Sequence, residues 1–220
     1  MTAKFGVNYE KLLAVLISLS VVAGSAFARG TYNGDIQLHI GTGADSMKMT
    51  KGSDSLDDIK SNTFDFDIAS WHLFSLNDLF GVGFMIDLNG GFGGTKDYYI
   101  YESSVALHFN ALIGPAASFT FGNIASVNVA AGLAFGVPGF GYKVGNQNRA
   151  ISSAGIGFGA EVNGKFFPKS KVSPLAGFRF STLGSKTYSY KIGDGDIQTQ
   201  DVDSVSIINS EFFVGVAFNF

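Results

Sequence analysis

The chain has 220 residues, of which 46% are hydrophobic, 14% aromatic and only 15% charged, with 29 Gly, 22 Phe, no Cys and a formal net charge of −3. This composition excludes an intrinsically disordered chain, and the lack of Cys excludes disulfide scaffolds, thiol enzymes and Cys-based zinc sites. The acidic balance argues against a nucleic-acid binder and the Gly content against a helical bundle, which leaves one all-β domain.

The N-terminus carries the pattern of an export signal. An uncharged apolar run follows Lys11 and is short for a membrane helix, which needs about 20 residues. The run ends in Ala26-Phe27-Ala28, the small-x-small pattern that signal peptidase cleaves. We therefore expect residues 1–28 to be a signal peptide and residues 29–220 to form the mature domain. An uncleaved anchor is the alternative. N-terminal sequencing distinguishes the two, because the mature protein should begin at Arg29.

From residue 35 onward, apolar residues alternate with small or polar ones, which is the period of a β-strand with one apolar face. The alternation predicts eight strands, at 35–41, 63–74, 79–89, 105–121, 126–137, 153–166, 172–181 and 207–220. The phase is blurred near Trp71, and Pro115 and Pro174 fall inside strands, where proline removes a hydrogen-bond donor. We expect a β-bulge at each of these three places.

The same alternation would suit a soluble β-sandwich, so other features must decide. The predicted connections alternate between short turns, near 75–78, 122–125 and 167–170, and long loops, near 43–62, 90–98, 138–150 and 182–203. This asymmetry is typical of outer-membrane barrels. Gly155, Gly157 and Gly159 on the polar face suit a crowded barrel interior better than a solvated surface. The sequence therefore predicts an all-β, eight-stranded antiparallel transmembrane β-barrel, with short periplasmic turns and long outer loops.

The last strand ends in alternating apolar residues, Phe212, Val214, Val216, Phe218 and Phe220. This strand resembles the C-terminal signature of bacterial outer-membrane proteins. The mature chain as a whole resembles the small eight-stranded barrels of the OmpX, OmpW and OmpA class. The resemblance implies export to the bacterial outer membrane, contact with outer-membrane lipid, and recognition of the last strand by the barrel-assembly machinery. No motif assigns one subfamily.

The alternation points a set of charged side chains into the barrel: Asp65, Asp67, Asp87, Glu161, Glu211, Lys165 and Arg179. His39 and His108 share this phase. Because buried charges must be paired or solvated, we expect an ion-pair network centred on Arg179 with Glu161 and Glu211. The alternative is a narrow aqueous path, for which the inward glycines would leave room and whose excess of carboxylates would favour cations.

Aromatic residues near predicted strand ends indicate interfacial girdles at Trp71, Phe74, Tyr98, Tyr99 and Tyr101. Packing of these rings within loops is the alternative. The three His residues lack metal-ligand spacing, and the acidic loop at 193–203 lacks the EF-hand pattern. We therefore expect no metal and no other cofactor.

Serine, histidine and acidic residues occur without a spacing that marks a catalytic set, so we expect no enzyme activity. The favoured function is a non-enzymatic outer-membrane barrel with a structural role, or with a role in surface contacts through an extracellular ligand at its outer loops. The alternative is a narrow cation-preferring channel or a small-molecule transport protein. A membrane-embedded enzyme is the third possibility.

Overall fold

The computed structural model describes residues 31–52, 54–96 and 104–220, and most of these residues are in strands. The predicted signal peptide and the predicted girdle residues Tyr98, Tyr99 and Tyr101 lie outside the described residues. Within the described part of the chain, no helix is long and apolar enough to cross a membrane.

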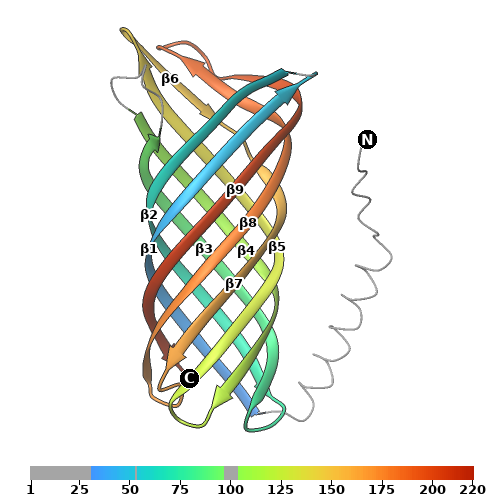
Figure 1. Ribbon diagram of the computed structural model, residues 1–220, viewed down its shortest axis with the longest axis vertical. Helices are drawn as coiled ribbons and strands as arrows, with labels where there is room; N and C mark the ends of the chain where they lie inside the picture. The colour runs from blue at the N-terminus through green and yellow to red at the C-terminus, as the bar shows by residue number, and fades with distance from the viewer. Residues whose placement is uncertain (1–30, 53, 97–103) are drawn as a thin grey trace.

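The described residues form nine strands of one antiparallel sheet, which closes into a barrel (Figure 1). They are β1 (Thr31–Lys51), β2 (Asp54–Ser75), β3 (Phe80–Lys96), β4 (Ser104–Phe121), β5 (Ala125–Val144), β6 (Gln147–Ser152), β7 (Gly155–Phe166), β8 (Val172–Ile192) and β9 (Gln198–Asn219). β9 pairs with β1, from Asn219 opposite Asp35 to Ser204 opposite Thr50, and this pairing closes the ring. β6 and β7 share one position between β5 and β8, so the ring has the eight positions that the sequence predicts.

The two ends of the barrel differ. The turn end carries the short connections at 76–79, 122–124 and 167–171, each within one residue of its predicted place, and also Phe220 (Figure 1). The opposite end, the hairpin end, is where β1 meets β2, β5 meets β6 and β8 meets β9. Closure of the ring gives every described strand a pairing partner on both sides, which the edge strands of an open sheet in lipid would lack.

The prediction of long loops is wrong over the residues that the structure describes. Most of each predicted loop continues the neighbouring strands, so that β1 runs to Lys51 and β5 runs to Val144, and β5 turns into β6 through Gly145-Asn146. The outward residues of these extensions are polar, as at Ser46 and Lys48. The apolar alternation that marks the rest of each strand is therefore weak there, and sequence reasoning ended the strands too early.

None of the three predicted bulges is present. β2 keeps its register with β1 and β3 across Trp71, and β8 keeps its register with β9 at Pro174. Beside Pro115 the β4–β5 ladder lacks two residue pairs and then resumes in the same register. A proline costs a ladder hydrogen bond, but the pairs on either side hold the strand in place. The register shifts instead between Met49 and Thr50 and between Ser185 and Thr187.

Gly83 marks a place where two strands approach too closely for a side chain. A Cβ on this residue of β3 would overlap the backbone carbonyl of His72 on β2, whereas a Cβ on Gly90 would meet its nearest atom at 3.8 Å. We expect Gly83→Ala to lower the free energy of unfolding by roughly 1–3 kcal/mol and Gly90→Ala to change it by less than about 0.5 kcal/mol. Urea titration in lipid vesicles measures both, and equal losses would contradict this packing.

Candidate functional site

The outer surface carries an apolar belt around the whole ring. The belt residues are exposed and come from all eight strand positions: Ile36, Leu38, Ile40, Phe64, Phe66, Ile68, Phe84, Ile86, Leu88, Leu107, Phe109, Ile113, Val129, Leu133, Phe135, Ile156, Phe158, Val162, Phe180, Phe212, Val214 and Phe218. Soluble monomers rarely expose an apolar surface of this extent, and the outward apolar band of a membrane barrel has this form.

Arg179 on β8 lies at the centre of a buried polar network. Its guanidinium contacts the carboxylates of Asp67 on β2, Asp87 on β3 and Glu211 on β9, with 3.0 Å between Nη2 and Asp67 Oδ1. All four residues are buried. β3 lies opposite β8 in the ring, so this side chain spans the lumen. The planar fork of guanidinium N–H groups allows one Arg to serve several carboxylates at once.

His108 and Asn89 extend the network toward the hairpin end. His108 Nδ1 lies 2.7 Å from Asp45 Oδ2, and its Nε2 lies 2.7 Å from Asn89 Oδ1. The amide nitrogen of Asn89 donates to the carboxylates of Asp67 and Glu211, which sets the orientation of this amide. Both ring nitrogens of His108 therefore lie within hydrogen-bond distance of side-chain oxygens of the network.

A second branch of the network runs to the turn end. Asp67 Oδ2 lies 3.4 Å from His39 Nδ1, and His39 Nε2 lies 3.0 Å from Gln37 Oε1. Gln37 donates to Asp35 at 2.8 Å, and Lys165 donates to the same carboxylate at 2.5 Å. The β1 members of the branch are spaced two residues apart, as side chains on one face of a strand must be. Polar contacts thus link the centre of the barrel to its turn-end mouth.

All seven charged residues that the sequence points inward lie inside the barrel, but one predicted contact differs. Glu161 is opposite Arg179 in the β7–β8 ladder, yet its carboxylate accepts a hydrogen bond from Asn163 at 3.0 Å, while the guanidinium is directed at carboxylates of other strands. Strand order indicates which residues are neighbours in the wall. A long side chain in a narrow barrel instead reaches across it.

Sequence reasoning missed two buried carboxylates, Asp35 and Asp45. Asp35 begins the first predicted strand and Asp45 lies just beyond it, and continuing the alternation along β1 would have placed both inward. The described interior thus holds seven buried carboxylates against two buried Lys or Arg side chains, Lys165 and Arg179. Within the described residues, no group of three or more His, Asp or Glu side chains is arranged to hold a metal ion.

Apolar side chains fill the lumen on both sides of the network. A buried cluster at the hairpin end includes Met47, Met49, Ile59, Phe140, Ile151, Val205 and Ile207. Nearer the turn end, Trp71 and Met85 lie opposite each other in the β2–β3 ladder and are fully buried. Leucine side chains pack against two of the inward glycines, because a Cβ on Gly155 or Gly159 would meet side-chain atoms of Leu183 or Leu112 at 3.0 Å.

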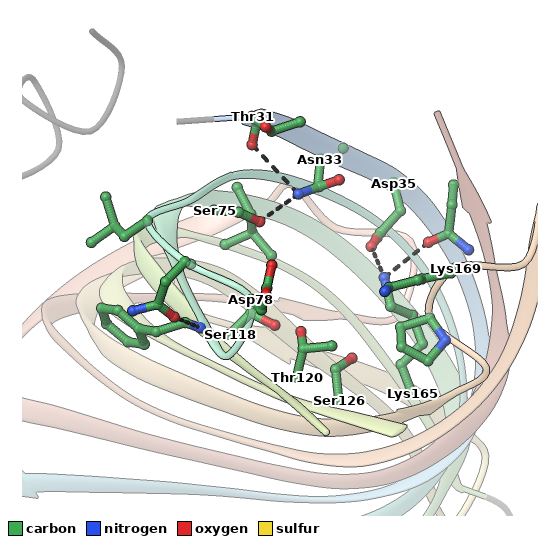
Figure 2. A pocket seen from close by; sticks show the side chains of 18 of the residues that line it. Thr31, Asn33, Asp35, Ser75, Asp78, Ser118, Thr120, Ser126, Lys165 and Lys169 are labelled. Carbon is green, nitrogen blue, oxygen red and sulfur yellow. Dashed lines mark hydrogen bonds and ion pairs between the residues drawn. The ribbon is translucent and has the colours of Figure 1, made fainter. Parts of the chain in front are cut away.

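A cavity of about 450 Å³ opens at the turn end (Figure 2). Its wall includes Thr120, Ser126 and Lys165, which are neighbours across β4, β5 and β7. Lys169 and Asp78, from two of the short turns, also line it. Two residues further into the barrel, the inward side chains are at most 1% exposed at Gln37, Trp71, Asn128 and Asn163. The cavity is therefore a blind pocket, which ends at this layer of side chains, below Arg179.

No family model matches the chain, and no curated protein matches it by sequence. Its structure is similar to the outer membrane protease OmpT from Escherichia coli, with a TM-score of 0.51 and 8% identity over 86% of this chain and 96% of that one. It is also similar to the outer membrane protein OprG from Pseudomonas aeruginosa, with a TM-score of 0.51 and 9% identity over 87% and 98%. The chain has the fold of a small outer-membrane β-barrel. Ail, the attachment invasion locus protein of Yersinia pestis, matches with a TM-score of 0.45 and 14% identity over 85% and 99%.

Aromatic residues of an outer-membrane barrel gather where the apolar belt meets the lipid headgroups. Phe74 packs on Tyr32 with 5.2 Å between ring centroids, and Tyr32 lies 6.3 Å from the ring of Phe220, so these three form an aromatic group at the turn end. The girdle prediction is wrong for Trp71, which is fully buried inside the barrel. Successive residues of a strand point to opposite faces, so residues that are an odd number of positions apart, such as Trp71 and Phe74, cannot both face outward.

Proposed function

We propose that this chain is a non-conducting, non-enzymatic barrel of the bacterial outer membrane, whose role is structural or lies in surface contacts at its hairpin end. The observation that carries the proposal is the filled lumen. Arg179 spans the barrel to three carboxylates, and buried apolar side chains lie on both sides of this network. A path for ions or solutes would have to displace these groups.

The apolar belt supports the outer membrane as the location, with lipid acyl chains as its partner. Phe212, Val214, Phe218 and Phe220 are exposed on the outside of the C-terminal segment, where the barrel-assembly machinery would recognise them. In this fold the short turns face the periplasm. The hairpin end then faces outward from the cell.

Paired strands beyond the belt support a contact surface at the hairpin end. β1 and β2 remain paired out to Lys51 and Asp54, and β8 and β9 remain paired out to Tyr190 and Gln198. Strand pairing holds the exposed side chains of these hairpins in fixed positions, which lowers the entropic cost of binding a partner. An extracellular ligand would bind at this end.

The positions of the histidines support a non-enzymatic role. His39 and His108 are buried within the polar network. His72 lies on the outside of β2, 2.7 Å from the hydroxyl of Tyr32 and 3.0 Å from that of Ser70. The chain has three His residues, and none of them lines the turn-end pocket, so a histidine base is not available to a substrate bound there. Hydrolysis of peptide, ester and glycoside substrates by the refolded protein tests this, and turnover would contradict it.

We expect the refolded protein to show no steady conductance in a planar lipid bilayer, because the network and the apolar layers fill the lumen. The alternative, a narrow channel, predicts small currents. These would prefer cations, since seven buried carboxylates face two Lys or Arg side chains in the described interior. The presence or absence of a steady current distinguishes the two, and the reversal potential across a salt gradient gives the ion preference of any current. A steady cation-preferring current would replace the present proposal with the channel, and an anion preference would contradict both.

A further inference from the structure

The pocket at the turn end contains hydrogen-bond donors that the barrel itself does not use. Ser126 is 2% exposed, and its hydroxyl has no hydrogen-bond partner among the described residues. Thr120 is directly opposite Ser126 in the β4–β5 ladder, and its hydroxyl has no partner in the described chain either. Both side chains point into the pocket (Figure 2). A buried hydroxyl without a partner is costly unless something else occupies the space beside it.

Lys165 continues this row of donors, because it is opposite Ser126 in the β5–β7 ladder. Its ammonium donates to Asp35 at 2.5 Å and to Asn219 at 2.9 Å. A lysine has three N–H donors, so one remains for a ligand. Lys169 lines the same pocket four residues later, is exposed, and has no ion-pair partner within the described chain. Two hydroxyls, one ammonium proton and one unpaired ammonium group therefore line the pocket, together with the carboxylate of Asp35, whose charge Lys165 neutralises.

We propose that this pocket binds a small organic anion through its carboxylate or phosphate group. The anionic oxygens accept hydrogen bonds from Thr120, Ser126 and Lys165, and Lys169 adds positive charge at the entrance. The pocket volume of about 450 Å³ lies within the range of small-molecule sites. Leu73, Phe80 and Phe220 also line it and give the ligand an apolar contact.

Two features limit which anion fits. Asp78, from the turn between β2 and β3, also lines the pocket and has no ion-pair partner among the described residues. Because Lys169 is the one lysine of the lining without an ion-pair partner in the described chain, the charge of Asp78 favours a ligand with a single anionic group. The pocket is blind, so the ligand enters and leaves through the turn end, which is the periplasmic side in this fold. This anion-binding proposal does not depend on whether the barrel conducts ions, nor on what its hairpin end contacts.

Binding can be measured on the ¹⁵N-labelled, refolded protein, through the amide signals of Thr120 and Ser126. Sodium butyrate and inorganic phosphate are the two probes, and sodium chloride at equal ionic strength is the control. We expect saturable shifts with at least one probe and none with chloride. The probe that saturates identifies the group, carboxylate or phosphate. Shifts that chloride reproduces, or no saturation with either probe, would overturn the proposal.

Matched variants test the assigned residues without disturbing the barrel wall. Lys169→Gln should raise Kd about two- to fivefold, because it removes the unpaired charge. Lys171→Gln changes an exposed lysine of the same turn that does not line the pocket, and it should change Kd by less than about twofold. Asp78→Asn should lower Kd, because it removes repulsion. Equal effects of the two lysine variants, or weaker binding in Asp78→Asn, would overturn the assignment.

Discussion

Arg179→Met is expected to destabilise the barrel more than any other single change in the polar network. The substitution removes the cation that contacts Asp67, Asp87 and Glu211, and it leaves three carboxylates facing one another in the lumen. Removing one partner of a buried ion pair costs about 3–5 kcal/mol, and here one cation serves three partners. Urea titration of the protein in lipid vesicles measures the loss. Arg179→Lys keeps the positive charge but lacks the planar fork of guanidinium N–H groups, so its loss of stability should lie between those of the wild type and Arg179→Met.

A double-mutant cycle separates the direct interaction between Arg179 and Glu211 from non-specific destabilisation by either substitution. Glu211→Gln removes one of the three carboxylates, so the double variant Arg179→Met/Glu211→Gln should lose less stability than the sum of the single variants, by about 0.5–3 kcal/mol. Lys171→Met supplies the control cycle with Glu211→Gln, because Lys171 is exposed in a short turn and lies outside the polar network. That cycle should be additive within about 0.5 kcal/mol. Additivity in both cycles would show that Arg179 and Glu211 do not interact.

Among substitutions on the outer face, Phe158→Arg is expected to cause the largest decrease in the free energy of unfolding. Phe158 is 47% exposed on β7, and its neighbour Leu133 in the β5–β7 ladder belongs to the same belt. Arg at the midplane of a lipid-facing surface costs roughly 2–4 kcal/mol, because its charge leaves water for acyl chains. Urea titration in lipid vesicles gives the value.

Asn62→Arg is the matched control for Phe158→Arg. Asn62 is exposed and outward on β2, two residues beyond the belt residue Phe64 toward the hairpin end. An Arg there reaches water or headgroups, so we expect a loss of at most about 1 kcal/mol. Similar losses for the two variants would show that Phe158 does not face lipid.

The period of two in the sequence determined most of the architecture. Because successive strand residues point to opposite faces, the alternation from Ile36 to Phe218 assigned lipid-facing and inward residues, and it placed Arg179, Asp87 and Glu211 together inside. The short turns were located to within one residue. The face to which a side chain points and the position of a turn both depend on local backbone geometry, and residues close together in the sequence specify that geometry.

Strand length and contacts across the barrel were decided by the tertiary structure. The hairpin extensions pair because β1, β2, β8 and β9 are already aligned below them, although their polar outer faces give a weak strand signal. Trp71 lies inside because β2 stays in register between two neighbouring strands. Arg179 contacts Asp87, 92 residues earlier in the chain, because ring closure brings β8 opposite β3 at a distance that one side chain can span. The pocket at the turn end likewise depends on ring closure, which places Thr31, Ser118 and Lys165 around one space although no local pattern links them.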